Sequence, residues 1–161
     1  MIKIPTESER KKMPAGGYVC KILKVETATN RYDEPCLLLY LDVAEGDFKN
    51  YFGDIYARRL EHGEDKFPCV YNQGMTEFTT RKFNHLISSI KASNAGYAST
   101  CMQGADWDET ELENLLVGVV FREKEYINSR GRKHVMLVPH VFKSVDEIRR
   151  GDFDIPSRFY T

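Results

Sequence analysis

The 161-residue sequence lacks several features that would assign a protein to a class at once. No apolar run approaches the roughly 18 residues that a membrane-spanning helix needs, and the opening MIKIPTESERKKMPAGG lacks the apolar centre of a signal peptide. The four cysteines are far apart, with no Cys-x-x-Cys pair and no Cys/His cluster at zinc-finger spacing. We therefore expect a soluble, cytoplasmic protein with no membrane partner, in which the cysteines are reduced packing residues.

Motifs of enzyme sites are missing as well. The sequence contains no nucleophile elbow, P-loop or dinucleotide-binding fingerprint. The 23 Lys and Arg residues against 24 Asp and Glu give a net charge of -1, which excludes a global attraction to nucleic acid. We expect no catalytic residue, no metal and no cofactor, and any site for a polyanion must be local.

The residues that are present suffice for one folded domain. Hydrophobic residues make up 42% of the chain and aromatic residues 12%, too many for a disordered segment. We expect a single domain over 1–161, with 1–13 as a mobile N-terminal segment and 150–161 as a C-terminal tail.

The hydrophobic pattern predicts five strands and one long helix. Alternation is clearest in 36–44, where Leu37, Leu39 and Leu41 share one face and Tyr40 lies on the other. The other strands are expected at 18–27, 48–57, 115–127 and 133–143, with a brief return strand at 69–72. A helix is predicted over 76–93, capped by Thr76 or Thr79, and a capping box predicts a short helical turn at 145–149.

The order of three strands, a helix and two strands is the topology of the OB-fold. We therefore expect a mainly β protein, a five-stranded OB-fold-like Greek-key barrel with its helix between strands three and four. Another small mixed barrel with the same order remains an alternative.

An OB-fold binds oligonucleotides on strands two and three and on the loops one-two and four-five. Bases stack on exposed rings for about 1–3 kcal/mol each, while Lys and Arg neutralise phosphates. The residues of these regions that suit nucleic acid are Arg31, Tyr32, Tyr40, Lys49, Tyr51, Tyr56, Arg58, Arg59, Arg122, Lys124, Arg130, Arg132 and Lys133.

Other interpretations compete with this one. Some aromatic residues of 48–57 must belong to the core, and the basic turn near Arg130 is also typical of a solvated hairpin. His134 and His140 have no evident third metal ligand, and Trp107, between acidic neighbours, is expected to cap the helix or the barrel end. Three aspartates are conceivable magnesium ligands of a nuclease, although turns and surface positions explain them better: Asp42, Asp47 and Asp54.

Five segments of the sequence together resemble a known family. They are MPAGGYVCKILKV, YLDVAEGDFKNYFGDIY, ISSIKASNAGY, LVGVVFREKEYINSRGRK and FKSVDEIRRGDFDIPSR, which span most of the chain. They are similar to small proteins encoded in the replication and recombination regions of phages and prophages of Gram-positive bacteria, described as OB-fold, single-stranded DNA-binding-like proteins. The resemblance implies an OB-fold that binds single-stranded DNA in the cytoplasm of the bacterial host.

The sequence thus favours a non-enzymatic protein that covers single-stranded DNA during phage replication or recombination. A second copy of the chain and replication or recombination proteins are further expected partners, and DNA and RNA remain alternatives. A module that binds a replisome or host-defence protein through the same face is the second hypothesis, and a metal-dependent nuclease is the third.

Overall fold

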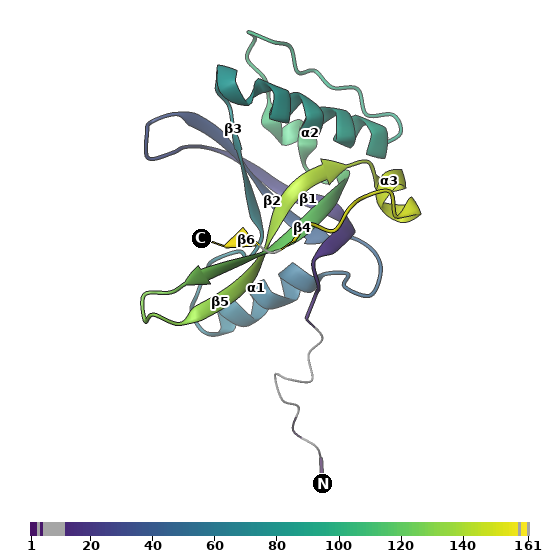
Figure 1. Ribbon diagram of the computed structural model, residues 1–161. Helices are drawn as coiled ribbons and strands as arrows, with labels where there is room; N and C mark the ends of the chain where they lie inside the picture. The colour runs from purple at the N-terminus through teal and green to yellow at the C-terminus, as the bar shows by residue number, and fades with distance from the viewer. Residues whose placement is uncertain (3, 5–11, 158, 161) are drawn as a thin grey trace.

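One antiparallel sheet dominates the computed structural model, which describes residues 1, 2, 4, 12–157 and 159–160. Its five main strands lie in the order β3-β2-β1-β4-β5, and helices α1 and α2 lie at opposite ends of the sheet (Figure 1). A short sixth strand runs parallel to β4. The elements, in chain order, are β1 (Gly16–Thr29), β2 (Pro35–Val43), α1 (Tyr51–Glu61), β3 (Val70–Gly74), α2 (Thr80–Ser93), β4 (Leu116–Ile127), β5 (Lys133–Lys143), α3 (Val145–Arg150) and β6 (Phe159–Tyr160), with short 3-10 turns at Glu77–Thr79 and Glu109–Leu112.

The predicted core face of β2 is confirmed. Leu37, Leu39, Leu41 and Val43 are all buried, whereas Tyr40 lies half-buried on the opposite face. β2 pairs with β1 in an antiparallel hairpin, and β1 pairs on its other side with β4. The core therefore forms mainly between this sheet and the helices at its ends.

The prediction of a third strand over 48–57 is wrong, because α1 begins at Tyr51 within that segment. Its aromatic residues favour a strand, but Phe52, Ile55 and Tyr56 also recur at helical spacing and face one side of α1. The third strand is instead β3, close to the expected return strand at 69–72.

The N-terminus of α1 is held by a carboxylate from β2. Asp42 accepts hydrogen bonds from the backbone N–H groups of Phe52, at 2.9 Å, and Gly53, at 3.0 Å, as well as from Val43. These donors are among those that a helix leaves unsatisfied at its first turn. Burial raises the pKa of Asp42, and the three backbone donors act in the opposite direction.

Helices α2 and α3 confirm the sequence predictions closely. α2 buries Phe83, Leu86, Ile87 and Ile90, the stripe expected from the sequence, and its N-cap is Thr79. Thr76 caps the 3-10 turn that precedes it. α3 begins after a capping box, as expected from the residues that follow Lys143.

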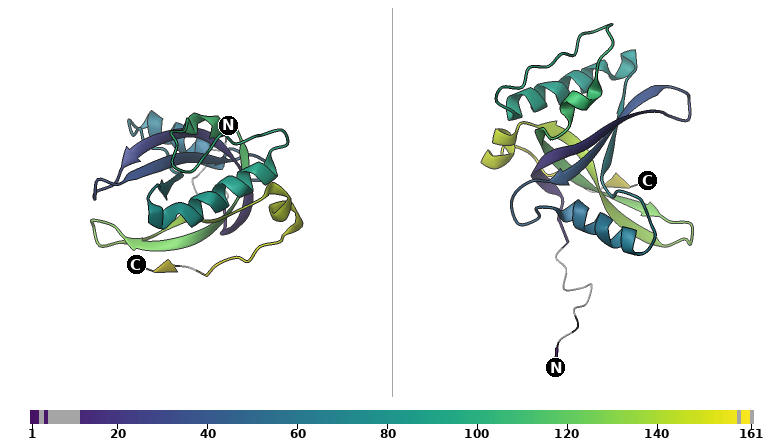
Figure 2. Two further views of the ribbon diagram at one scale, coloured as in Figure 1. Left: turned by 90° about the horizontal axis from the view of Figure 1, so that it is seen from above. Right: turned by 180° about the vertical axis from the view of Figure 1, so that it is seen from behind.

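The sheet is not closed into a barrel. β3 and β5 are the two ends of the strand order, and no pairing joins them among the residues that the structure describes. Seen from above, α2 lies between the β1–β2 hairpin and the β4–β5 hairpin (Figure 2). Two contacts bridge the opening: the ring of Tyr71 on β3 is 4.7 Å from that of Phe142 on β5, and Nε2 of His85 on α2 lies 2.8 Å from the carbonyl oxygen of Phe142.

The segment between α2 and β4 folds over the helix. Trp107 packs edge-on against Phe83 of α2, with ring centroids 5.6 Å apart, so its predicted role as a cap over the helix is confirmed. The Glu111 carboxylate accepts hydrogen bonds from the hydroxyl groups of Tyr97 and Thr100. These bonds hold both ends of the segment together.

The structure describes only parts of the two ends of the chain. Most of 1–13, the segment expected to be mobile, lies outside the described residues, but Met13 is buried in the core. The tail expected from residue 150 returns to the sheet as β6.

The cysteines are all free, and three of them are buried, as predicted for packing residues. No described helix has the length and apolar character needed to cross a membrane.

Candidate nucleic-acid interface

A groove of about 590 Å³ lies along β5, where the sheet is open. We call it the basic groove, and its lining residues are Tyr71, Arg81, Lys82, His85, Arg122, Lys124, Val138, Pro139, His140, Val141 and Phe142. Four of these residues are permanently cationic and two are histidines, and none of the described lining residues is acidic. The groove is therefore a local positive site on a protein of almost neutral net charge.

Helix α2 supplies one wall of the basic groove. Its apolar stripe faces the core, so the opposite side of the helix presents Arg81, Lys82 and His85, which lie within four positions of one another. The contact between His85 and the Phe142 carbonyl fixes this side of the helix against β5.

Strand β4 supplies the second pair of cations. Arg122 and Lys124 are two positions apart, so their side chains lie on the same face of the strand. The guanidinium of Arg122 donates two hydrogen bonds to the carbonyl oxygen of Ser157, at 2.9 and 3.2 Å. This contact orients Arg122 without neutralising its charge.

Burial and cations from both walls of the groove lower the pKa of His140. Burial lowers this pKa, and the charges of Arg122 and Lys82 lower it further. Because these two residues come from β4 and α2, the field at His140 combines both walls of the groove. The imidazole is therefore neutral at pH 7 and gains its charge only under more acidic conditions.

A second hollow, of about 860 Å³, lies beside β1, β2 and the N-terminal half of α1. In this aromatic hollow, the ring of Phe67 lies 5.8 Å from that of Tyr40 and 5.3 Å from that of Tyr56. The Tyr40 hydroxyl donates to Glu26 and the Tyr56 hydroxyl to Asp65. These bonds fix the orientation of both tyrosine rings. The lining residues are Leu23, Lys24, Tyr40, Gly53, Tyr56, Asp65, Lys66, Phe67, Pro68 and Val70.

The aromatic hollow and the basic groove are neighbours across β3. Val70 lines the hollow and the next residue, Tyr71, lines the groove. Side chains of successive strand residues point to opposite faces, so β3 forms the boundary between the two surfaces. A flexible chain that crosses this narrow strand can contact both.

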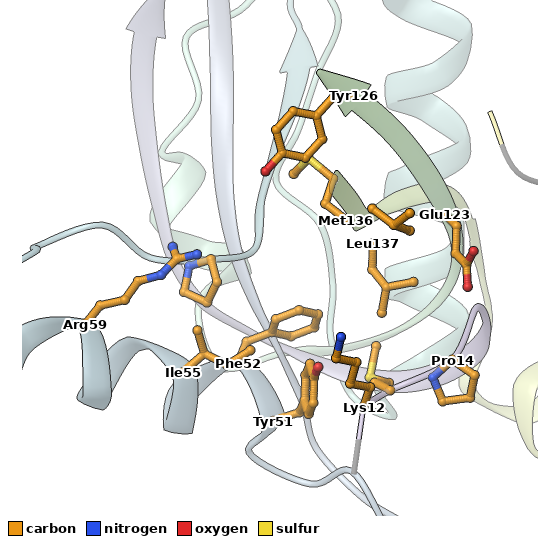
Figure 3. Close-up of a pocket in the computed structure, with 13 residues that line it drawn as sticks. Lys12, Pro14, Tyr51, Phe52, Ile55, Arg59, Glu123, Tyr126, Met136 and Leu137 are labelled. Atoms are coloured by element: carbon orange, nitrogen blue, oxygen red, sulfur yellow. The ribbon is translucent and has the colours of Figure 1, made fainter. Parts of the chain in front are cut away.

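A third hollow, the hairpin pocket, has a volume of about 500 Å³ and lies between α1 and the β4–β5 hairpin. Figure 3 shows Phe52, Ile55 and Leu137 around one space, with the Lys12 ammonium group near them and Arg59 at one edge. The complete lining is Lys12, Met13, Pro14, Tyr51, Phe52, Ile55, Arg59, Pro68, Glu123, Tyr126, Val135, Met136 and Leu137.

The structure divides the predicted site residues among these hollows. Arg122 and Lys124 line the basic groove, Tyr40 and Tyr56 line the aromatic hollow, and Tyr51 lines the hairpin pocket. Arg59 also lines the hairpin pocket and donates a hydrogen bond to the carbonyl oxygen of Lys66. Lys49, Tyr51, Tyr56, Arg58 and Arg59, all expected on or beside a third strand, lie on α1 or just before it.

The remaining predicted residues lie at the tips of the two hairpins. Arg31 stacks over Tyr32 in the β1–β2 turn, with its guanidinium carbon 5.0 Å from the ring centroid. Three exposed bases lie in or beside the β4–β5 turn: Arg130, Arg132 and Lys133. None of these five residues lines the basic groove, so the structure does not gather the predicted site into one surface.

Asp42 is not available as a ligand of the hypothetical magnesium site. The oxygen atoms of Asp42 are occupied by the cap of α1, which corrects the hypothetical set of Asp42, Asp47 and Asp54. In the part of the chain that the structure describes, no group of three or more acidic, histidine or cysteine side chains is placed to hold a metal ion.

Sequence reasoning missed the wall that α2 contributes. Arg81 and His85 are four positions apart, and Lys82 lies between them, so helical spacing predicts one basic side. The apolar stripe of this helix predicts which side faces the core, but it does not predict what lies opposite the polar side. The nearness of that side to Arg122 depends on tertiary structure.

Comparisons with known proteins assign no family to the chain. No protein-family model matches it, and no curated protein matches it in sequence. The basic groove is therefore interpreted from its geometry and charge.

Proposed function

We propose that this protein binds single-stranded nucleic acid and is not an enzyme. The observation that supports this most directly is the basic groove, where Arg81 and Lys82 of α2 meet Arg122 and Lys124 of β4 with no acidic lining residue. Cations in this arrangement neutralise successive phosphates and release the counterions condensed on them. The binding is then independent of base sequence.

The aromatic hollow supports the choice of single strands. Tyr40, Tyr56 and Phe67 offer ring faces next to the groove, and unpaired bases stack on such rings. The bases of a duplex already stack on one another and are not free to do so. Lys24, whose ammonium group is 5.6 Å from the centre of the Tyr40 ring and 2.5 Å from a carboxylate oxygen of Glu26, forms an ion pair beside this surface.

The strand order supports an OB-like fold. The order β3-β2-β1-β4-β5, with α2 between β3 and β4, is the order of a five-stranded Greek-key barrel that stays partly open. We therefore propose an OB-like fold, and with it the role implied by the resemblance to phage proteins. In this role the protein covers single-stranded DNA during phage replication or recombination.

The test is a titration of a labelled oligo-dT of about 30 nucleotides, followed by fluorescence anisotropy at about 50 and 200 mM salt. With four phosphates neutralised, log affinity falls with log salt at a slope of about -2.8, roughly a fifty-fold loss between these conditions. Excess duplex should not displace the oligonucleotide. Affinity that does not depend on salt would contradict the proposal.

Matched variants locate the binding surface. Arg81→Gln combined with Lys82→Gln removes two cations of the groove and should reduce the magnitude of the salt slope by about 1.4. Lys91→Gln combined with Arg150→Gln removes the same charge from exposed residues outside the groove and should leave the slope unchanged. Equal losses in both variants would indicate only a general electrostatic attraction.

Binding of a protein segment is the second candidate. Among the residues that the structure describes, β5 pairs with β4 alone, and it exposes Val135 at 48% and Met136 at 41%. Its apolar residues therefore offer a surface for an added strand. If monodisperse protein binds no oligonucleotide at about 50 mM salt, this candidate replaces the first.

A further inference from the structure

We propose that the hairpin pocket receives one unstacked base of the bound strand. The inference rests on the proposed function, because the strand must first lie in the basic groove. It assigns a separate task to the pocket: the groove holds phosphates, and the pocket selects a strand that has a free base.

Strand β5 connects the two sites. Residues 135–137 line the hairpin pocket, and residues 138–142 line the basic groove. A nucleic-acid strand that follows β5 out of the groove therefore meets the pocket next. Because the lining of the pocket begins at the residue where that of the groove ends, the two sites adjoin along β5.

The walls of the pocket suit a flat, partly polar ring. Phe52, Ile55 and Leu137 provide apolar contacts, while Tyr51 and Tyr126 add aromatic rings with hydroxyl groups (Figure 3). Bases combine apolar faces with polar edges, so rings beside apolar side chains favour them.

Two cations and one carboxylate, that of Glu123, line the pocket. The ammonium group of Lys12 lies among the lining side chains, and Arg59 stands at one edge of the space in Figure 3. Arg59 Nη1 donates to the carbonyl oxygen of Lys66 at 3.1 Å, which holds its guanidinium in place. A base that enters the pocket brings its own phosphate close to these charges, which an uncharged aromatic ligand would not use.

The volume of the pocket is within the range of ligand sites. A cavity left by truncating one core side chain has a volume of about 150 Å³, whereas ligand sites range over about 300–1,000 Å³. The hairpin pocket, at about 500 Å³, falls within the second range. Met136 remains 41% exposed at its edge, so a ligand would also cover apolar surface that now contacts water.

Oligonucleotides with single abasic positions test the proposal on the unaltered protein. The oligomer should be no longer than full affinity requires, so that the strand cannot slide to avoid the gap. One abasic position should lower the affinity about 5- to 150-fold, the range for the loss of one base contact, while the other positions have smaller effects. The salt slope should stay the same, since no phosphate is removed.

A variant that fills the pocket provides the second arm. Met136→Trp should weaken binding of the intact oligomer and abolish the effect of the sensitive abasic position, because the base can no longer enter. Leu60→Trp, a substitution at an exposed residue of α1 outside all three hollows, is the control and should leave both results unchanged.

The outcomes separate the two proposals. Binding with the expected salt slope, but with no sensitive abasic position and an unaffected Met136→Trp variant, would overturn the base pocket and leave the proposed function intact. Failure of the unaltered protein to bind any single strand would overturn both. An unfolded Met136→Trp variant, recognised by circular dichroism, leaves the decision to the abasic series on the unaltered protein.

Discussion

The contact between the Asp42 carboxylate and Gly53 is possible because residue 53 has no side chain. A Cβ atom at Gly53 would lie 2.7 Å from Asp42 Oδ2, closer than real Cβ contacts allow. The carboxylate has little freedom to move away, because it already accepts three backbone hydrogen bonds. Position 53 therefore requires glycine, because any side chain there would displace the carboxylate of Asp42, eleven positions earlier.

This contact gives a prediction in which one substitution has opposite effects in two backgrounds. Gly53→Ala should lower the free energy of unfolding by about 1–3 kcal/mol, because the methyl group displaces the Asp42 carboxylate. In an Asp42→Ala background the clash is absent, and the same change should stabilise α1 by up to about 1 kcal/mol through helix propensity. Urea denaturation of the four proteins of this cycle measures both values, and equal effects in the two backgrounds would contradict the assigned contact.

Glu111 predicts a pH-dependent effect. Burial raises the pKa of Glu111, but hydrogen bonds to its carboxylate, including those from Thr100 and Tyr97, outweigh this effect and lower the pKa below its usual value. A carboxylate whose pKa is lower in the folded state adds stability above its unfolded pKa and loses it as the pH falls through the folded value.

We therefore expect Glu111→Gln to lower Tm at pH 7, with the difference from the original protein shrinking as the pH falls below the usual range of glutamate. Thermal denaturation over a series of pH values measures this difference. Trp107 is the only tryptophan of the chain and packs on α2, so its fluorescence reports the same segment. A Tm difference that is constant with pH would argue against the role of the Glu111 charge.

At the scale of the elements, α3 packs against β4 through a glycine. A Cβ atom at Gly118 would lie 2.5 Å from Ile148 Cγ1 and 2.8 Å from the carbonyl oxygens of Lys143 and Ser144. The carbonyl groups are backbone and cannot rotate away as a side chain end can. Close approach of α3 to the sheet thus requires glycine at this position of β4.

Gly118→Ala should consequently destabilise the protein by about 1–3 kcal/mol, the usual range for overpacking. Adding Ile148→Ala removes the side-chain clash but leaves both carbonyl contacts, so it should restore stability in part at most. Denaturant titrations of the single and double variants measure this. If the double variant regained the full stability of the original protein, the clash with the Ile148 side chain would be the only cause of the destabilisation.

The elements also explain which predictions from the sequence succeeded. Strand β2 and helix α2 were predictable because each contains one strong hydrophobic period, Leu37 to Val43 in the first and Phe83 to Ile90 in the second. The aromatic residues of the segment that forms α1 fit both the two-residue period of a strand and the 3.6-residue period of a helix. The cap from Asp42, which lies on another element, favours the helix, and local patterns do not reveal it.

For the whole molecule, the basic groove shows why a site can escape sequence analysis. Arg81 and Arg122 are far apart in sequence and become neighbours only because the sheet is open between β3 and β5. The β4 cations were predicted from local charge, but their partners on α2 depend on that opening. Residues at hairpin tips, such as Arg31 and Arg130, were easier to identify and lie outside the groove.

The strand order also determines the sequence in which a growing chain can fold. β1 pairs with β2 after a short turn, but its other edge pairs with β4, as in the match of Cys20 to Val117, about a hundred positions later in the chain. During synthesis the three-stranded meander of β1, β2 and β3 therefore emerges with one edge of β1 unpaired. Contacts of such long sequence separation slow folding and leave strand edges exposed to aggregation. We therefore expect the second edge of β1 to stay unpaired, and exposed to aggregation, until β4 has left the ribosome.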